Sequence, residues 1–339
     1  MKILFVAMKY DYGISERGFS FEHFNFYESL VGMGHDVEYF DFMDLYRKHG
    51  SVRMTSQLLE RVRTTKPDLV FSVLFTDEFD HTALRRLRRE ISIPIVNWFS
   101  DDHWRYETFS RHWADCFTHV VTTDEASVQK YIAAGETIPL LSQWGVNHYR
   151  YTAQQGPMRH MVSFVGQPYG KRRSVIRTIR QRGIDVCVRG TGWNVGLHHR
   201  IFNKLGILSP EKYEDLCNST RIDQQGMVDM FRSTRINLNL SDAYRKGYRK
   251  QIKARTFEIP GCGGFQLCEE TEHLSDYFIP DQEIVTFTST EEMLEKIHYF
   301  LSHDHERNTV ASSGHQRVLR DHTYEKRFQQ LFASVGISS

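Results

Sequence analysis

The feature that most constrains the fold is a regular alternation of short, strongly apolar segments with amphipathic segments. Residues 68–75 (DLVFSVLF) and 93–99 (IPIVNWF) are too apolar to leave one face of a strand in water. Strands of this kind lie inside parallel sheets that helices cover on both faces. Between such runs stand segments with helical periodicity, for example residues 81–90 (HTALRRLRRE). The alternation predicts an α/β protein built on parallel sheets.

The alternation runs through residues 1–147 and restarts near residue 160. The intervening segment, 148–159, loses the hydrophobic periodicity and contains Gln, Gly and Pro, as is typical of a linker. A chain of 339 residues is long for one core and comfortable for two domains. We therefore expect two Rossmann-like domains, 1–147 and 160–320, that face a central cleft at the carboxyl ends of their strands. The final helical segment, 321–339, is expected to pack across the domains.

Charge and cysteine content exclude several classes of protein. The 43 basic and 42 acidic residues leave a net charge of +1, so no overall field attracts nucleic acid or an anionic membrane. No apolar run approaches the roughly 18 residues that span a bilayer, and the short apolar start is predicted to be a first strand, not a signal peptide. The five cysteines are scattered, and Cys262 and Cys268 are too isolated to predict a metal site. We expect reduced thiols and a cytoplasmic location.

The stretch KARTFEIPGCGGFQLCEE, which begins at Lys253, combines a short helix, a glycine-rich turn and a buried strand. Lys253 and Arg255 place cations at the helix start, where backbone amides also favour a phosphate. Glu258 can accept hydrogen bonds from a sugar diol one turn further on. Gly263 and Gly264 would let the backbone approach a ligand closely. Taken alone, the stretch fits a nucleotide-sugar pocket or an ordinary helix with a glycine C-cap.

Two earlier turns of the second domain carry similar chemistry. In FVGQPYGKRR, Gly166 precedes a turn, and Lys171 and Arg172 open a helix whose N-terminus would hold a diphosphate. In VRGTGW, Gly190 and the Trp193 ring would approach a base or ribose. Each turn has a plain alternative: a solvated basic helix face for the first and a packed tryptophan for the second.

A dense basic run, DAYRKGYRKQIKAR, ends at Arg255 and favours a phosphate target. Its tyrosines, Tyr244 and Tyr248, would also stack on bases. Together with the basic clusters at 85–89 and 171–173, the run therefore also fits a polyanionic partner. Its cations are Arg245, Lys246, Arg249, Lys250, Lys253 and Arg255.

Candidate acceptor chemistry lies in the first domain. Glu22 and His23 stand near a helix start, behind the glycine-containing loop that follows the first strand. Asp101 and Asp102 follow the strand IPIVNWF, again at a carboxyl end. These two acids, or His23, would supply a general base for an acceptor hydroxyl. The acids would equally cap the next helix or bind a divalent metal, and the residues alone leave these alternatives open.

The motifs of the second domain follow one another in a characteristic order. They are FVGQPYGKR, VRGTGW, KARTFEIPGCGGFQL, DYFIPDQEIVTFTSTEEM and RVLRDHTYEKR, and they cover most of residues 161–327. In this order they resemble the second domain of GT-B glycosyltransferases, most closely the CgeB-like, spore-maturation-type family. The first domain is similar only in its strand-helix rhythm and its WFSDD stretch.

The resemblance implies that the second domain binds a nucleoside diphosphate sugar and the first domain binds the acceptor. Glu258 would then hold the ribose hydroxyls. The diphosphate would lie among Lys253, Arg255, Gly263, Gly264, Gly166 and Arg172. Such enzymes generally need no metal, because cationic side chains and helix ends offset the charge of the leaving group. We therefore expect no metal and no cofactor besides the donor.

The chain departs from the family pattern at one position that bears on stereochemistry. Many retaining GT-B enzymes carry two glutamates eight positions apart across this turn, whereas Gln266 stands eight positions after Glu258. The sequence thus favours a glycosyltransferase that acts on a hydroxyl of a saccharide, a protein or a modified nucleic acid. One alternative is the same fold acting on a polyanion such as modified DNA or a cell-surface polymer. Another is a non-catalytic nucleotide-sugar-binding protein.

Overall fold

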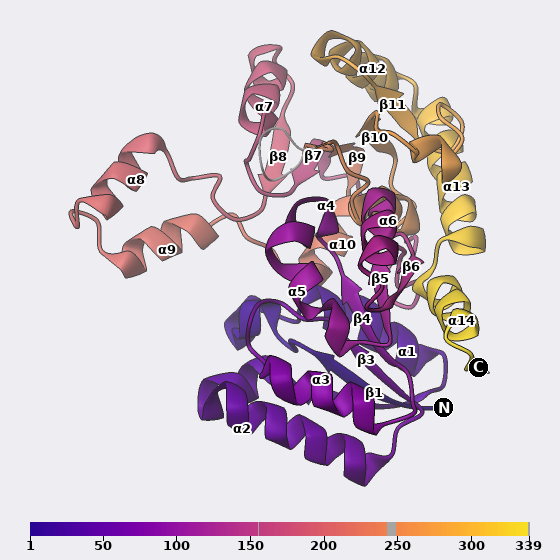
Figure 1. Ribbon diagram of the computed structural model, residues 1–339. Coiled ribbons are helices and arrows are strands. Elements are labelled where there is room, and N and C mark those ends of the chain that lie inside the picture. Colours follow the sequence, from indigo (N-terminus) through magenta and orange to yellow (C-terminus); the bar gives the residue numbers. More distant parts are fainter. Residues whose placement is uncertain (155, 243–248, 338–339) are drawn as a thin grey trace. The chain divides into compact units, whose positions relative to one another are not determined.

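The computed structural model describes residues 1–154, 156–242 and 249–337, which form two compact units. Unit 1 contains Met1–Arg150 and the segment from His322 onward, and unit 2 contains Tyr151–Asp321. The division therefore falls inside the segment that lost its hydrophobic periodicity. The end of the chain returns to unit 1 as helix α14 (Figure 1).

Unit 1 is built on a six-stranded sheet whose described strands all run parallel, in the order β2-β1-β3-β4-β5-β6. The strands are β1 (Lys2–Ala7), β2 (Asp36–Asp41), β3 (Leu69–Ser72), β4 (Ile95–Phe99), β5 (His119–Thr122) and β6 (Ile138–Leu141). The helices are α1 (Glu28–Gly32), α2 (Phe42–Thr65), α3 (His81–Glu90), α4 (Asp102–Arg105), α5 (Arg111–Trp113), α6 (Glu125–Ala134) and α14 (Tyr324–Ser334). Two π-helical segments, Glu22–Tyr27 and Tyr106–Ser110, lead into α1 and α5.

Helices cover both faces of this sheet, as the apolar strands require. On one face Leu4 and Val6 of β1 pack with Leu58 of α2 and Leu87 of α3, and Figure 1 shows α2 beside α3. On the other face, strand residues pack with Phe328 and neighbouring residues of α14. Successive residues of a strand point to opposite faces, so each buried strand contributes to two cores.

The C-terminal segment is joined to unit 1 by backbone pairing as well as by its apolar face. The Val146 amide donates to the carbonyl of His322, and the Tyr324 amide donates to the carbonyl of Val146, each at 3.0 Å. Arg327 donates to the carbonyl of Gln143 at 3.1 Å. The HTY motif at 322–324 therefore anchors α14 to the strand-following segment of unit 1.

Unit 2 is built on a five-stranded sheet whose described strands are also parallel, in the order β11-β10-β9-β7-β8. The strands are β7 (His160–Val165), β8 (Val186–Arg189), β9 (Thr234–Asn239), β10 (Gln266–Glu269) and β11 (Val285–Phe287). The helices are α7 (Arg172–Gln181), α8 (Leu197–Lys204), α9 (Pro210–Asn218), α10 (Gln224–Arg232), α11 (Arg255–Gly261), α12 (Thr290–Ser302) and α13 (Asp304–Asp321). Figure 1 shows α8 and α9 projecting away from the sheet of unit 2.

The expected architecture of two α/β Rossmann-like domains with parallel sheets is confirmed. Because all strands of a parallel sheet end on the same edge, the loops after β1, β3 and β4 meet in unit 1, and those after β7, β8 and β9 meet in unit 2. Within the described residues, no helix is long and apolar enough to cross a membrane.

Candidate active site

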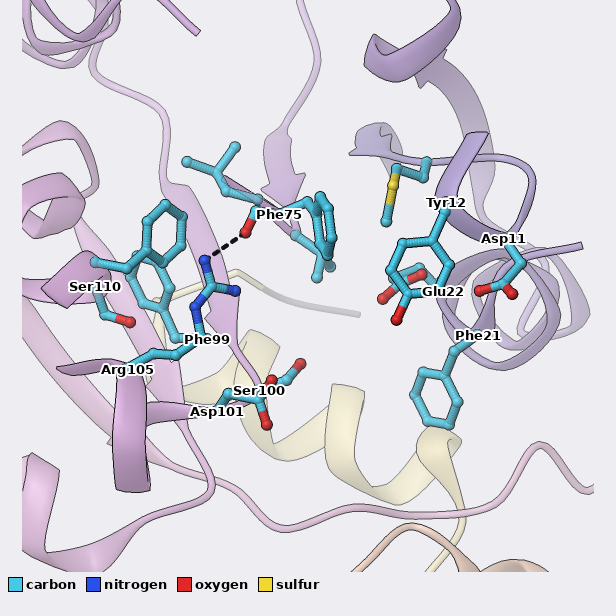
Figure 2. A pocket seen from close by; sticks show the side chains of 14 residues that line it. Asp11, Tyr12, Phe21, Glu22, Phe75, Phe99, Ser100, Asp101, Arg105 and Ser110 are labelled. Atoms are coloured by element: carbon cyan, nitrogen blue, oxygen red, sulfur yellow. Dashed lines mark hydrogen bonds between the residues drawn. The ribbon is translucent and has the colours of Figure 1, made fainter. Parts of the chain in front are cut away.

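The carboxyl ends of β1, β3 and β4 surround a pocket of about 170 Å³ in unit 1 (Figure 2). Its walls combine carboxyl groups with aromatic rings. The carboxyl groups are those of Asp11, Glu22 and Asp101, and the aromatic side chains are those of Tyr12, Phe21, Phe75, Phe99 and Phe109. A concave site with apolar walls and a few convergent polar groups is the usual form of a small-ligand site.

Asp101, a predicted catalytic residue, lines this pocket. It stands directly before α4, and its backbone carbonyl accepts hydrogen bonds from the amides of Trp104 and Arg105 at 3.0 and 2.9 Å. Its carboxylate does not cap the helix. The capping alternative therefore does not describe Asp101, whose side chain faces the pocket (Figure 2).

Asp102 occupies a different environment although it is the next residue. It is 2% exposed, and its Oδ2 accepts a hydrogen bond of 3.0 Å from the hydroxyl of Tyr131 in α6. Burial raises the pKa of Asp102 to about 6, although hydrogen bonds from Ser110, Thr122 and Tyr131 oppose the rise. Asp102 is not among the residues that line the pocket. The two predicted acids are thus separated into one pocket residue and one core residue.

His23 is also buried, outside the lining of the pocket. Its ring stacks on Phe19 with centroids 4.1 Å apart and contacts the rings of Tyr27 and Tyr39. Burial lowers the pKa of His23 to about 4, and the charges of Lys9 and Arg150 add to this effect. The ring is neutral at pH 7 and belongs to an aromatic cluster, so its placement does not favour the predicted role as a base for a ligand in this pocket.

Glu22 is the pocket residue that the sequence interpretation underrated. It opens the π-helical segment Glu22–Tyr27, and the second π-helical segment supplies Phe109 and Ser110 to the same pocket. Burial raises the pKa of Glu22, and the nearby charge of Asp101 contributes to the rise. π-Helical turns are rare and occur frequently at functional sites. The available signal was its position just after the loop that follows the first strand.

Arg105 is the basic residue in the pocket lining. Its guanidinium donates a hydrogen bond of 2.7 Å to the carbonyl of Phe75 and lies over the Phe109 ring, 4.1 Å from the centroid. Burial lowers the pKa of Arg105, while the charges of Asp101 and of other nearby carboxylates oppose that change. Its positive charge is therefore already partly balanced inside the protein.

In unit 2, three of the predicted nucleotide-binding residues meet at the carboxyl edge of the sheet. The indole Nε1 of Trp193 donates a hydrogen bond of 2.7 Å to the carbonyl of Gly166, which follows β7. A Cβ on Gly190, which follows β8, would overlap that same carbonyl. Gly190 also has φ +131°, a conformation that favours glycine. The FVG and VRGTGW motifs are therefore packed directly against each other.

Arg172 lies beneath these turns and is fully buried. Its guanidinium donates to the carbonyls of Gln167 and Leu240 at 3.1 and 2.8 Å and stacks 3.7 Å from the Tyr169 ring centroid. Burial lowers the pKa of Arg172 to about 10, and the charge of Arg255 also lowers it. Arg172 thus holds together the loops after β7 and β9, which is a supporting role beneath the predicted phosphate site.

Lys171 is held by an acid that lies 98 positions away in the sequence. Its Nζ pairs with Oε1 of Glu269, at the end of β10, and Lys250 reaches the same oxygen at 3.2 Å. The Ser241 amide donates to the other oxygen of Glu269 at 3.0 Å. Burial by itself would raise the pKa of Glu269, but these partners outweigh it and lower the pKa. Two predicted phosphate-binding lysines therefore share one buried carboxylate, which offsets one of their two positive charges.

Arg255 and Glu258 lie on α11, as expected from the motif. Within the described part of the chain, no hydrogen bond or ion pair engages the Arg255 guanidinium. Its charge acts on both Arg172 and Glu258. Glu258 is 2% exposed, and its Oε1 accepts a hydrogen bond of 3.0 Å from the hydroxyl of Tyr151. Burial raises the pKa of Glu258 to about 7, against the opposing influence of Arg255 and Tyr151.

Backbone conformation and packing explain why positions 263 and 264 are glycines, Gly263 and Gly264. Gly263 has φ +71°, and its amide donates to the carbonyl of Pro260 at 2.8 Å, so it ends α11 in the manner of a glycine cap. A Cβ on Gly264 would stand 2.9 Å from the side-chain amide of Asn237 in β9. The plain alternative for this turn, a helix with a glycine C-cap, therefore describes its backbone. A predicted packing of these glycines against a diphosphate is not needed to explain them.

The other predicted cations are distributed more widely. Lys253 precedes α11, and its carbonyl accepts the Thr256 amide at 2.9 Å. Arg249 is exposed and pairs with Glu272 at 3.3 Å. Arg245 and Lys246 lie outside the described residues, as do Tyr244 and Tyr248.

The basic cluster at 85–89 is also partly paired within the protein. Arg85 pairs with Asp115 at 2.9 Å, and Arg86 pairs with Glu90. A continuous basic surface for a polyanion therefore does not follow from these described arginines.

One group of side chains within the described residues has the composition of a metal site: His81, Asp115 and Cys116. The Asp115 carboxylate already forms a hydrogen bond with Nε2 of His81 and an ion pair with Nε of Arg85, each at 2.9 Å. Burial and the adjacent Asp115 raise the pKa of the Cys116 thiol, which disfavours the thiolate that a metal would need. None of the three lines the pocket of Asp101.

Comparison with known proteins bears on the fold and the family of the chain. Residues 171–333 match a family described as "Glycosyl transferase-like". The chain carries a glycosyltransferase-like domain. The chain is also similar to the spore protein CgeB of Bacillus subtilis (strain 168), with 19% identity over 282 residues, or 80% of this chain and 84% of CgeB.

Several solved structures share the fold of this chain. Anabaena Alr3699/HepE, solved in complex with UDP and glucose, has a TM-score of 0.61 and 13% identity, covering 98% of this chain and all of that one. A glycosyltransferase from Rickettsia africae ESF-5 has a TM-score of 0.59 and 10% identity, covering 100% and 99%. These structures confirm the expected GT-B fold, and the family match over residues 171–333 confirms the expected glycosyltransferase class. The resemblance to CgeB is confirmed at low identity.

Proposed function

We propose that the protein transfers a sugar from a nucleoside diphosphate sugar, bound at the carboxyl edge of unit 2, to a hydroxyl of an acceptor bound in the pocket of unit 1. The observation that carries the donor half is the placement of Arg255. Its guanidinium has no hydrogen-bonding or ion-pairing partner among the described residues, yet its charge acts on the buried Arg172. Two positive charges near each other beside glycine turns favour an anion such as a diphosphate.

The donor would be held by groups on both sides of the glycine turns. Arg255 would bind the diphosphate directly, and Arg172 would keep the turns after β7 and β9 in place from below. Glu258, whose Oε1 is held by Tyr151, would receive a ribose hydroxyl on its other oxygen. UDP is the first nucleotide to test, because a protein of the same fold has been solved with UDP and glucose.

In the transfer step, a bond forms between the acceptor oxygen and the anomeric carbon of the donor while the bond to the diphosphate breaks. The acceptor proton would pass to Asp101, which acts as the general base. The leaving diphosphate carries the electron pair of the broken bond, and Arg255 offsets that charge. We propose that Arg255, together with Arg172, offsets the charge of the leaving group without a metal ion. Transfer should therefore persist in the presence of a chelator such as EDTA. The five free cysteines support a reducing compartment, and we propose the cytoplasm.

The test of the donor site is a thermal-shift titration with UDP, GDP and dTDP. A ligand that binds the folded state raises the melting temperature with its concentration relative to its affinity. We expect one nucleotide to stabilise the wild type and to bind at least tenfold more weakly to Arg255→Ala. Arg177→Ala, which removes an exposed arginine of α7 in the same unit, is the matched control and should bind like the wild type. If no nucleotide stabilises the wild type, or if Arg255→Ala binds as well, the donor assignment is wrong.

A non-catalytic sugar- or nucleotide-binding protein is distinguished by chemistry. It would bind the nucleotide but neither hydrolyse nor transfer the donor sugar. Release of UDP from UDP-sugars, followed with and without candidate acceptors, separates it from the transferase.

A further inference from the structure

The pocket of unit 1 has a charge balance that bears on the acceptor. Among the described residues, the charged groups of its lining are three carboxyl groups and one guanidinium, that of Arg105. Arg105 is partly satisfied by the Phe75 carbonyl and the Phe109 ring, and Asp101 already acts on its charge. An anionic ligand entering this pocket would therefore meet carboxyl groups, with no free cation among the described lining residues to pair with. Like charges brought together in a site of reduced dielectric repel one another strongly.

The same lining suits a polyhydroxylated ligand. Carboxylate oxygens are strong acceptors for hydroxyl and ammonium donors. Aromatic side chains form part of the lining, among them Phe21 and Phe99, and the rings of Tyr12 and Phe75 contact each other edge to face with centroids 5.5 Å apart (Figure 2). Such rings pack on apolar C–H faces, and their faces also attract cations. A sugar ring offers hydroxyl donors at its edge and C–H groups on its faces.

The size of the pocket limits how much of an acceptor it can hold. Its volume of about 170 Å³ is below the roughly 300–1,000 Å³ of pockets for drug-sized ligands. One sugar residue is therefore a better match than a polymer segment. The Asp101 carboxylate, as part of the lining, would contact a hydroxyl of that residue.

We infer that this pocket binds a single acceptor sugar residue that is uncharged or carries an amino group, and that it discriminates against uronates, phosphates and nucleic acids. This inference rests on the proposed function in one respect, that the ligand of this pocket is the acceptor. The Asp101 carboxylate selects the ligand by charge, the Glu22 carboxyl group adds hydrogen bonds to its polar groups, and the aromatic side chains orient its ring. The described residues of the basic clusters do not form part of this selection, because none of their arginines or lysines lines the pocket.

The test measures acceptor binding separately from transfer. Dissociation constants are determined by ligand-observed NMR for three matched series, built on glucose, galactose and mannose. Each series contains the methyl glycoside, the 2-amino sugar and the uronic acid, and a single-stranded oligonucleotide serves as the polyanion. We expect at least one neutral or amino sugar to bind at least tenfold more tightly than its uronic acid partner. Equal or tighter binding of the uronic acids or of the oligonucleotide, or no binding of any neutral or amino sugar, overturns the inference.

Variants assign the selectivity to the pocket. Glu22→Gln and Asp101→Asn should each weaken binding of the favoured sugar by at least tenfold and narrow its advantage over the uronic acid. The control is Glu16→Gln, in the loop between β1 and Glu22. The Glu16 carboxyl is exposed and does not line the pocket, so this variant should bind the sugar like the wild type. Circular dichroism confirms that each variant is folded. If both pocket variants keep the full selectivity, another site recognises the sugar.

The nucleotide titration keeps the two proposals distinguishable. Glu22→Gln and Asp101→Asn lie in unit 1 and should leave the UDP-induced stabilisation intact. If the pocket prefers neutral or amino sugars but no nucleotide binds, the transferase proposal is wrong and the inference about the pocket stands. If a nucleotide binds but the pocket prefers anionic acceptors, the donor site stands and the inference about the pocket is wrong.

Discussion

The Tyr151 hydroxyl donates a hydrogen bond of 3.0 Å to Oε1 of Glu258, and both side chains are buried. The bond joins the first residue of unit 2 to the helix that carries the glycosyltransferase-like motif. Burial raises the pKa of the Glu258 carboxyl to about 7, even though Arg255 and Tyr151 favour its ionised form. The protonation of this carboxyl is therefore linked to the stability of unit 2.

Glu258 should make stability fall as the pH rises. Its folded-state pKa lies above the ordinary value of 4.5, so its contribution is fully present below pH 4.5 and is lost as the pH rises through 7. We expect the wild type to lose roughly 2 to 3 kcal/mol from this group between pH 5 and pH 8. The side chain of Glu258→Gln cannot ionise, so this variant should lose less unfolding free energy than the wild type between the two pH values, by that same amount. Urea unfolding at pH 5 and pH 8 measures the difference. The control Glu295→Gln changes an exposed residue of α12 and should keep the wild-type pH dependence of stability. If Glu258→Gln loses stability as steeply as the wild type, the pH dependence does not come from Glu258.

Gly190 and Gly183 separate backbone strain from steric overlap. Both have positive φ, +131° and +77°, but a Cβ on Gly190 would overlap the Gly166 carbonyl, whereas nothing lies within 4 Å of a Cβ on Gly183. Gly183→Ala should cost about 1 kcal/mol from strain. Gly190→Ala should cost at least about 3 kcal/mol, because the turns after β7 and β8 must also move apart. Urea midpoints measure the difference, and similar midpoints for the two variants would mean that the two turns separate easily.

Asp101 and Asp102 should differ in their effect on catalysis. Asp101→Asn removes the proposed base and should lower kcat by about 100-fold or more. Asp102→Asn, in the core against Tyr131, should change kcat by only a few-fold in the fraction of protein that remains folded. Single-turnover rates at saturating donor and acceptor make the comparison. Equal losses in the two variants would show that Asp102, too, acts on the reacting groups.

Arg172 should matter for stability far more than a neighbouring arginine on the same helix. Arg172→Met leaves the carbonyls of Gln167 and Leu240 without their donor inside the protein and should cost about 3 kcal/mol. Arg177→Met removes an exposed side chain of α7 and should change stability by less than about 0.5 kcal/mol. Urea unfolding of both variants tests the difference. A loss of nucleotide affinity in Arg172→Met at full stability would instead assign Arg172 to direct ligand contact.

Local sequence was sufficient for the elements and for the place of the motifs. The apolar runs predicted the parallel strands because only buried strands tolerate such composition on both faces. The same reasoning placed the Gly166 and Gly190 turns at the carboxyl edge of one sheet. The hydrogen bond between Trp193 and Gly166 shows how closely that edge brings them together.

Only the tertiary structure decided which polar groups satisfy one another. Lys171 is paired with Glu269 and Arg172 with the carbonyl of Leu240, partners 98 and 68 positions away. The local sequence around a residue does not predict such partners, because they meet only when strands far apart in the chain become neighbours in a sheet. A basic helix start can therefore bind an anion or hold its own protein together, and the pattern of residue types is the same in both cases.

The adjacent acids of unit 1 show the same limit at the scale of one residue. Asp101 is the N-cap residue, with φ −125° and ψ 27°, whereas Asp102 is the first residue of α4. This change of backbone conformation between adjacent residues leaves Asp101 in the lining of the pocket and Asp102 in the core beside Tyr131. The sequence by itself determined that an acid pair follows β4 at the carboxyl edge of the sheet. Which of the two acids lines the pocket depended on the packing of α4 against α6, where Tyr131 binds Asp102.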